Sequence, residues 1–338
     1  MKLYGGIDLH SNNCVLVILD QDGNKIFQRR LDNSITLILD TLLPYQTQLD
    51  GIVVESTFNW YWLVDDLMDA GFTLHLANTA AIQQYSGLKH ADDNSDARWL
   101  AEMLRLGILP TGYIYPKEQR MARDLMRKRM QLVQQKTLNL LAIQGLYSRH
   151  LCKRVSNNTL KKLTALQVDE DFSDVNVALA VTSNLAVMQC LAQHILVIEK
   201  QLKQQHNLSP EYLRLTSIDG IGFTLALTIM LETGEIGRFK KVGDFSSYCR
   251  CIGGARYSNG KKKGKTNSKN GNKFLAWAFV EAANFAIRYN TTVKRYYQKK
   301  LAKTNNTVAI KTVAHKLARA CFYVLRDQVD FDVHRAFG

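Results

Sequence analysis

The sequence has few prolines and no long uninterrupted apolar run. Only 4 of its 338 residues are proline, and 46% are hydrophobic, a composition that argues against long disordered linkers and suits a soluble globular protein. No segment approaches the roughly 18 consecutive apolar residues that span a bilayer. The first residues, MKLYGGID, place a lysine where a secretory signal would be apolar. We therefore expect an intracellular protein without a membrane-spanning segment.

Paired cysteines are also scarce. A structural zinc site needs four Cys or His ligands, usually in two close pairs, and only Cys249 and Cys251 are close in sequence. We therefore expect reduced and mostly buried thiols rather than a zinc site. The six cysteines are Cys14, Cys152, Cys190, Cys249, Cys251 and Cys321.

Acidic residues are nearly missing from one long segment. Residues 238–319 contain 20 Lys or Arg but only Asp244 and Glu281 as acids, whereas residues 1–115 contain 7 Lys or Arg and 14 Asp or Glu. A field of one sign repels itself unless a polyanion neutralises it, and the phosphate backbone of nucleic acid is the usual polyanion. A solvated basic face or a membrane-surface patch is the alternative. Lysines mixed with Tyr, Trp and Gly favour nucleic acid.

The N-terminal part has the pattern of an α/β fold. Three strands joined by short turns are predicted at 2–9, 13–20 and 24–31, followed by a helix over 34–48 and a strand over 51–55. A helix over 58–70, a strand over 72–76 and a helix over 95–106 complete the order. Three hairpin-linked strands followed by alternating helices and strands are typical of the ribonuclease H-like fold with a mixed sheet.

The middle and C-terminal parts are predicted to be mostly helical, with helices over 117–150, 274–289, 294–303 and 308–325. Apolar residues repeat at steps of four and three through 177–202, which favours a coiled coil or a long helical hairpin with 117–150; an ordinary core helix is the alternative. We expect three regions, 1–115, 116–208 and 209–338. The repeat consists of Val177, Val181, Asn184, Met188, Leu191, Ile195, Ile198 and Leu202.

One short motif precedes the basic region, and a second segment lies within it. Ser217-Ile-Asp-Gly220-Ile-Gly222 resembles a helix–hairpin–helix, in which backbone N–H groups at the next helix bind a phosphate. Residues 253–273 then combine glycine, lysine and hydroxyl groups. Glycine allows the backbone to approach phosphate closely. A flexible basic loop whose serines are only polar is the alternative for this segment.

Four acidic residues in the N-terminal part fall where strands end and a helix begins. Asp8 and Glu55 end strands that are adjacent in a ribonuclease H-like sheet, and Asp93 and Asp96 share one face of a helix. Carboxylates that converge favour Mg²⁺, and two ions clamp the oxygens of a phosphoryl transfer. Capping and turn roles are the alternative, and Asp92 competes with Asp93 as the ligand. We expect His10 to pack or to contact phosphate.

These residues resemble those of the insertion-sequence-110 family of transposases, including its 1111 subgroup and the Piv-type DNA invertases. The resemblance runs from end to end and rests on an ordered set of short motifs. They are Gly-Ile-Asp8, Val-Glu55-Ser-Thr, Asp93-x-x-Asp96-Ala, Gly220-Ile-Gly222, the Gly-Gly-x-Arg-x-Ser block that ends at Ser258, and Asn-Gly-Asn-Lys273-Phe-Leu.

The resemblance implies a RuvC-like domain whose Asp-Glu-Asp-Asp site is Asp8, Glu55, Asp93 and Asp96, a coiled-coil middle, and a C-terminal transposase domain with a nucleophilic serine. It implies recombination of target and donor double-stranded DNA through a phosphoserine, guided by a bridge RNA encoded in the element, in a prokaryotic, nucleoid-associated cytoplasmic protein. Ser258 is the implied nucleophile and Ser268 is the alternative. We expect Arg256 and Lys261 to stabilise the transition state, and four further lysines to contact the backbone: Lys262, Lys263, Lys265 and Lys273.

We expect a Mg²⁺-dependent site completed from a second domain or subunit, because neither the acids nor the basic loop alone supplies metal, nucleophile and cations. The coiled coil suggests a dimer or tetramer. The alternatives are a RuvC-like junction-resolving nuclease that uses activated water, and a non-catalytic nucleic-acid-binding protein. An actin-like ATPase also begins with a Gly-x-Asp strand, but this sequence lacks the second glycine-rich phosphate loop such an enzyme needs.

Overall fold

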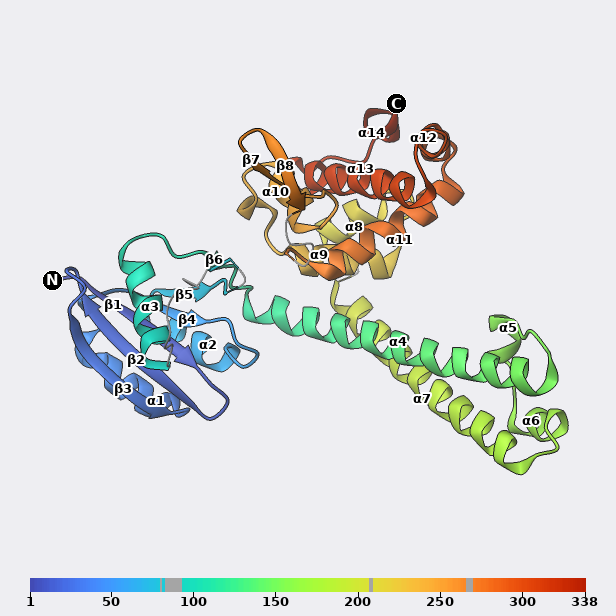
Figure 1. Cartoon of the computed structure of the whole chain (residues 1–338), viewed down its shortest axis with the longest axis horizontal. Coiled ribbons are helices and arrows are strands. Elements are labelled where there is room, and N and C mark those ends of the chain that lie inside the picture. The colour runs from blue at the N-terminus through green and yellow to red at the C-terminus, as the bar shows by residue number, and fades with distance from the viewer. Residues whose placement is uncertain (80, 83–92, 207–208, 266–269) are drawn as a thin grey trace. The chain divides into compact units, whose positions relative to one another are not determined.

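The chain begins with three antiparallel strands, β1 (Leu3–Leu9), β2 (Asn13–Asp20) and β3 (Lys25–Asp32). A computed structural model describes the chain apart from residues 80, 83–92, 207–208 and 266–269, and it divides into two units, Met1–Lys117 and Glu118–Gly338 (Figure 1). In the first unit, β4 (Leu49–Glu55) and β5 (Leu74–Ala77) follow in parallel to β1, and the short β6 (Thr111–Gly112) pairs antiparallel with β5. The sheet order is β3-β2-β1-β4-β5-β6.

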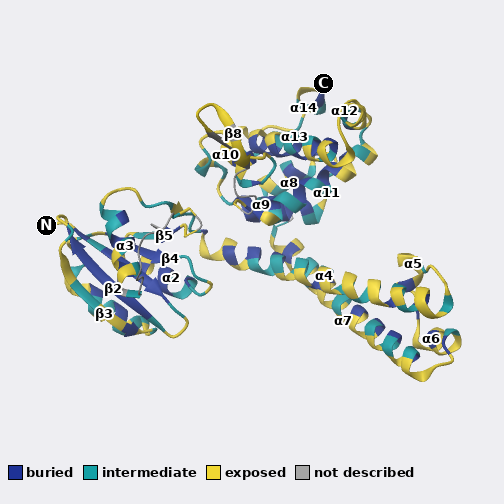
Figure 2. Cartoon of the chain, viewed as in Figure 1, coloured by how far each residue is buried: buried dark blue, intermediate teal, exposed yellow. Residues whose placement is uncertain are grey.

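Helices cover both faces of this sheet, and its central strands are buried (Figure 2). Alternate residues of a strand point to opposite faces. Ile7, Leu16 and Ile52 pack with α1 (Ile35–Leu42) and α2 (Tyr61–Asp69) on one face. Val15 and Val17 pack with α3 (Asp93–Arg105) on the other. A mixed six-stranded sheet in this order is consistent with the predicted ribonuclease H-like, RuvC-like domain.

The predicted helix over 34–48 is wrong in its second half. α1 ends at Leu42, a 3-10 turn η1 (Leu43–Tyr45) contains Pro44, and β4 already begins at Leu49. Proline has no backbone N–H to continue the helical ladder, so the helix cannot run through it. The two-residue strand β6 is also absent from the prediction.

Two long helices, α4 (Lys117–Leu151) and α7 (Val175–His206), dominate the first part of the second unit. Two short helices, α5 (Asn157–Leu160) and α6 (Ala165–Asp171), join them through a segment predicted to be only a polar break. The apolar repeat of α7 lies against α4. Ile143 and Tyr147 of α4 share a buried cluster with Val181 and Met188, and Leu202 shares another with Ala122 and Met126.

A polar contact also joins these two helices. Arg129 of α4 pairs with Glu199 of α7, with 2.6 Å between Nη2 and Oε1. Asn184 lies on the repeat and donates from Nδ2 to the Ala180 carbonyl oxygen of its own helix at 2.7 Å.

α7 is long and apolar enough to cross a bilayer by length and composition alone. Its packing against α4 accounts for part of that apolar surface.

The rest of the second unit is a helical globule with its own core around Phe245, Phe279 and Phe322. A two-stranded hairpin projects from it. The elements are α8 (Pro210–Thr216), α9 (Phe223–Thr233), η2 (Ile236–Arg238), α10 (Val242–Tyr248), β7 (Ala255–Ser258), β8 (Lys261–Lys265), α11 (Lys273–Tyr289), α12 (Thr291–Leu301), α13 (Asn306–Asp327) and α14 (Val333–Phe337). The predicted regions 116–208 and 209–338 fall together in this unit.

Candidate metal centre and basic hairpin

Two acidic side chains lie at the ends of neighbouring parallel strands. Asp8 is the penultimate residue of β1 and Glu55 is the last residue of β4. Ile7 and Val54 are partners in this pairing, so both carboxylates emerge at the same edge of the sheet. Asp8 is 3% exposed and Glu55 is half-buried. Burial of two acids side by side is costly unless a cation or a proton compensates their charge.

A glycine brings the third acidic element to this edge. A Cβ at Gly6 of β1 would overlap the carbonyl oxygen of Ala97 and would lie 2.8 Å from the nitrogen of Ala101. α3 therefore lies against the backbone of β1, and its first turn carries Asp93 and Asp96. Asp8 lies on the same face of β1 as Gly6, since residues two apart in a strand share a face.

Three carboxylates line one cavity. Asp8, Glu55 and Asp96 border a space of about 330 Å³ together with Thr79, Ile82, Trp99, Leu100 and Met103. Burial, a hydrogen bond to Asp8, and the negative charges of Asp8 and Asp96 raise the pKa of Glu55 to about 7. A divalent cation with oxygen ligands relieves such repulsion. The three carboxylates and the raised pKa of Glu55 therefore fit the binding of a divalent metal ion.

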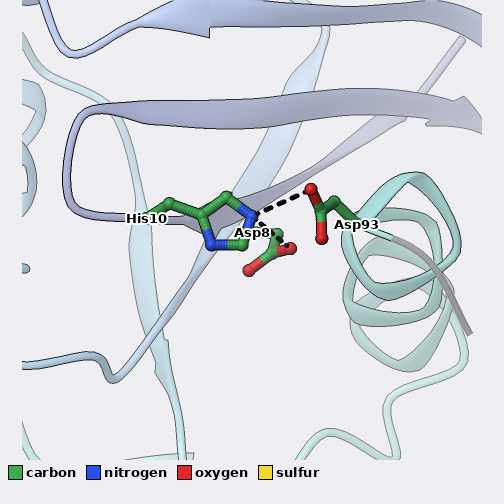
Figure 3. Close-up of side chains that lie close together, drawn as sticks. All are labelled: Asp8, His10 and Asp93. Carbon is green, nitrogen blue, oxygen red and sulfur yellow. Dashed lines mark ion pairs between the residues drawn. The ribbon is translucent and has the colours of Figure 1, made fainter.

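The fourth predicted ligand, Asp93, lies with a different group of side chains (Figure 3). Its Oδ2 lies 3.3 Å from Nε2 of His10, and the same His10 nitrogen lies 3.4 Å from Oδ2 of Asp8. Oδ2 of Asp93 also accepts a hydrogen bond of 2.6 Å from Nη2 of Arg30. That hydrogen bond, with the charges of Arg30 and His10, holds the pKa of Asp93 below its usual value. Asp8 thus belongs to both groups, and Asp92 lies outside the described residues.

Sequence reasoning missed His10 as part of this cluster, and it missed Arg30. A signal for His10 exists, because a residue two positions after Asp8 falls on the same side of an extended chain. Arg30 is on β3, two strands away from β1. Its pairing with Asp93 depends on the register of the sheet and on where α3 begins, which local sequence does not reveal.

Ser258 lies at the tip of a β-hairpin, where the prediction had only a loop. It is the last residue of β7, it is exposed, and it is paired with Lys261 across the turn. Asn259 and Gly260 form that turn with φ of 49° and 70°. Asn-Gly with positive φ at both positions is the sequence that favours a two-residue hairpin turn, so the signal was present in the sequence.

The predicted cationic residues are spread over this hairpin and the helix that follows. Lys261 and Lys263 are exposed on β8, and Lys273 is the exposed first residue of α11. Arg256, Lys262 and Lys265 belong to the two strands, but their side chains lie outside the described part of the structure, as does the whole of Ser268. The described lysines leave the hairpin tip strongly cationic, which suits phosphate contacts.

The end of the hairpin segment is held by a polar network that runs from the surface to the buried Asn272. Gly271 has φ of 89°, and a Cβ there would lie 2.6 Å from the Tyr248 carbonyl oxygen. Arg250 donates to the Gly271 carbonyl oxygen, with 2.7 Å from its Nη2. Asn272, 8% exposed, caps α11 by accepting from the N–H groups of Phe274 and Leu275. These contacts fix the position at which the hairpin segment rejoins the core.

This network continues to the long helix α4. Asn272 donates from Nδ2 to Oε2 of Glu232 at 2.7 Å, and Glu232 on α9 is 2% exposed. Arg127 of α4 binds the same carboxylate through both Nε and Nη2, at 2.6 and 2.7 Å. A bidentate pair of this kind fixes both partners. It ties α4, α9 and the start of α11 together.

The segment predicted to be a helix–hairpin–helix lies between α8 and α9. Gly220 has φ of 90°, and a Cβ there would overlap the Ala282 carbonyl oxygen and lie 2.6 Å from the Ala286 nitrogen. Gly220 is therefore needed for packing against α11. Gly222 is the N-cap of α9, and a Cβ at this position would have no neighbour within 4 Å among the residues that the structure describes. Both residues line a cavity of about 510 Å³ with the exposed aromatic side chains of Phe285 and Tyr289.

A mixed sheet that gathers carboxylates at one edge, followed by a helical unit, is consistent with a RuvC-like N-terminal domain. Comparison with known families makes this specific. The model of the DEDD-type transposase domain of the IS110 family matches residues 5–151, and the model described as "Transposase IS116/IS110/IS902 family" matches residues 212–298. The chain belongs to the IS110 family of insertion-sequence transposases, a class of enzymes that cut and rejoin DNA.

A curated relative covers most of the chain. The chain is 22% identical over 305 residues to the transposase for insertion sequence element IS1111A of Coxiella burnetii, an alignment that spans 86% of this chain and 80% of that protein. The resemblance to the insertion-sequence-110 family predicted from the sequence motifs is therefore confirmed at the level of the family.

Proposed function

We propose that the protein cuts and rejoins target and donor DNA through a covalent phosphoserine at Ser258, at a site that requires Mg²⁺ held by Asp8, Glu55, Asp93 and Asp96. The observation that carries the metal half is the convergence of Asp8, Glu55 and Asp96 on one cavity, with the pKa of Glu55 raised to about 7. The position of Ser258 at the exposed tip of a cationic hairpin supports the other half.

Bound Mg²⁺, with two ions per site, would stabilise the charge on the scissile phosphate and on the attacking and leaving oxygens. The protein side chains have separate tasks. The sheet fixes Asp8 and Glu55, and α3 fixes Asp96. The three carboxylates are therefore in position before the substrate binds. Lys261 and Arg256 stabilise the negative charge of the phosphate under attack. Lys262, Lys263, Lys265 and Lys273 bind the backbone on either side, and Gly222 offers N–H groups of α9 to a further phosphate.

Each chemical step conserves one phosphodiester bond. The Ser258 hydroxyl loses its proton as Oγ forms a bond to phosphorus, and the bond from phosphorus to one DNA oxygen breaks, with that oxygen taking up a proton. The 3′-hydroxyl of a second strand then attacks the phosphoserine, which restores Ser258 and joins the strands. No ATP is needed, because every broken P–O bond is replaced by another.

The proposed partners follow from charge and from the family. The basic region 238–319 binds double-stranded DNA and a guide RNA encoded in the element, a bridge RNA that pairs with target and donor. A dimer or tetramer forms along the long helices, whose outer faces expose Leu138 and Leu141 on α4 and Leu179, Leu196 and Val197 on α7. Apolar side chains exposed along one helix pair favour burial against another copy.

We place the protein in the prokaryotic cytoplasm, with the nucleoid.

A junction-resolving nuclease is the second candidate. It is favoured by one observation, that Asp8, Glu55 and Asp96 form their cavity wholly within the N-terminal unit, without Ser258. Such an enzyme would cut with activated water and would need no serine.

The two functions are separated by strand cleavage with the full-length protein, its copurified RNA and DNA that flanks the gene. Ser258→Ala should abolish cleavage while leaving the thermal unfolding temperature unchanged, and Ser268→Ala should cleave normally. Asp96→Asn should also abolish cleavage, and chelation should do so reversibly. If Ser258→Ala releases strands at the normal rate, the serine mechanism is wrong and the nuclease is favoured.

A further inference from the structure

His10 lies between two of the proposed metal ligands. Its Nε2 is 3.4 Å from Oδ2 of Asp8 and 3.3 Å from Oδ2 of Asp93, and the ligand atoms of the three residues all lie within 4.8 Å of one another (Figure 3). The three side chains come from the end of β1, the turn after it and the first turn of α3. The cluster therefore combines one nitrogen and two oxygen donors.

The histidine nitrogen is buried, although the ring as a whole is 36% exposed, and it faces these two carboxylate oxygens at distances longer than a good hydrogen bond. Its position is fixed by the backbone. The His10 carbonyl oxygen accepts from Nδ2 of Asn33 at 3.0 Å and from Nδ2 of Asn59 at 2.9 Å, and its N–H donates to the Asn13 carbonyl oxygen. The imidazole is therefore held with Nε2 between the two carboxylates, where a cation bound by all three groups would shorten none of these distances by more than a few tenths of an ångström.

The spacing of the three donors suits a shared cation. Ligands at about 2.1 Å from one ion, at right angles to each other, are separated by about 3.0 Å, and opposed ligands by about 4.2 Å. The two His10 distances, 3.3 and 3.4 Å, need only small adjustments to reach this spacing. Neutral imidazole binds first-row transition cations more strongly than it binds Mg²⁺, which prefers oxygen.

We infer that Nε2 of His10 is a direct ligand of a cation bound by Asp8 and Asp93, so that this position takes Mn²⁺ and related first-row divalent cations in preference to Mg²⁺. This inference rests on the proposed metal site, to which it adds a nitrogen ligand. Asp8 is shared between this position and the cavity lined by Glu55 and Asp96. The position with His10 offers nitrogen and oxygen donors, whereas the cavity with Glu55 and Asp96 offers oxygen donors alone.

Electron paramagnetic resonance of the full-length protein loaded with Mn²⁺ tests the inference without an activity assay. Electron spin echo envelope modulation detects a nitrogen bound directly to Mn²⁺. Wild-type protein should show this modulation, labelling with ¹⁵N-histidine should change its pattern, and His10→Gln should remove it. His10→Gln should also weaken Mn²⁺ binding by about tenfold or more, with a smaller effect on Mg²⁺.

His75→Gln is the matched control, because His75 is a half-buried histidine on β5 of the same sheet and is no member of the cluster. It should keep the nitrogen modulation. Modulation that persists in His10→Gln, with an unchanged unfolding temperature, overturns the inference. Mn²⁺ that binds wild-type protein with no nitrogen coupling overturns it too, while leaving a carboxylate metal site. Failure of Mn²⁺ and Mg²⁺ to bind at all overturns the proposed metal site as well.

Discussion

The backbone of Gly6 on β1 lies directly against that of Ala97 on α3, so that a Cβ at residue 6 would overlap the Ala97 carbonyl oxygen. This contact sets the distance between the strand that carries Asp8 and the helix that carries Asp96. A glycine in the first strand is therefore part of the construction of the acidic site.

Gly6→Ala should separate α3 from β1 and weaken the metal site. We expect a loss of about 1–3 kcal/mol in the free energy of unfolding, as for other overpacked positions, and weaker Mn²⁺ binding by titration calorimetry. Gly145→Ala on α4 is the control, since a Cβ there meets none of the described residues within 4 Å. It should be neutral or slightly stabilising. Equal metal affinity in Gly6→Ala and wild type would disprove this role.

Glu55 should make the metal-free protein less stable as the pH rises. Its pKa in the folded protein is raised from 4.5 to about 7, so folding favours the protonated form. That stabilisation is fully present below the unfolded pKa near 4.5 and is lost as the pH rises through about 7. Glu55→Gln should therefore flatten the fall in urea midpoint between the unfolded pKa of 4.5 and about pH 7, measured with a chelator.

The exposed Asp69 of α2 provides the control for this measurement. Asp69→Asn should keep the wild-type pH dependence, and saturating Mg²⁺ should reduce the dependence in wild-type protein. The same slope in Glu55→Gln and wild type would contradict the assignment of the raised pKa to Glu55.

Arg30 should compete with a metal for Asp93, because its Nη2 occupies Oδ2 of that carboxylate at 2.6 Å. Arg30→Gln should tighten Mn²⁺ binding about two- to fivefold, a size in keeping with an exposed ion pair. The neighbouring Arg29 on β3 is exposed and forms no ion pair with Asp93 in the part of the chain that the structure describes. Arg29→Gln should leave Mn²⁺ affinity unchanged. Equal or weaker binding by Arg30→Gln would refute the competition.

Glu232 should contribute far more to stability than a surface acid. It is 2% exposed and binds both Arg127 and Asn272, so Glu232→Ala removes the carboxylate that both side chains bind and should cost about 3–5 kcal/mol in the free energy of unfolding. Glu199, the acid of the pair with Arg129, is 28% exposed, so Glu199→Ala should cost about 1 kcal/mol or less. Similar losses in the two variants, measured by urea unfolding, would contradict the importance of the network.

The positions of the two strand-end acids could be predicted from the sequence, whereas the arginine side chains that pair with the acidic residues could not. Strand alternation and the turn residues predict that Asp8 and Glu55 end adjacent strands, and the sheet order bears out that adjacency. The Arg30–Asp93 pair joins residues 63 apart, and the Arg127–Glu232 pair joins residues 105 apart. Such contacts depend on strand register and on helix packing, which no local pattern specifies. The Asn259-Gly260 turn is different, because its local signal was present in the sequence.

The covalent attachment of DNA to Ser258 is the central claim, and peptide mass spectrometry tests it most directly. The full-length protein, its copurified RNA and Mg²⁺ would be incubated with flanking DNA that is nicked near the cut site, so that the leaving strand diffuses away and the intermediate accumulates. After denaturation and digestion, the account predicts a nucleotide phosphate on the peptide that contains Ser258, and none with Ser258→Ala or Asp8→Asn. Cleaved DNA without any protein adduct, or an adduct on Ser268, would contradict it.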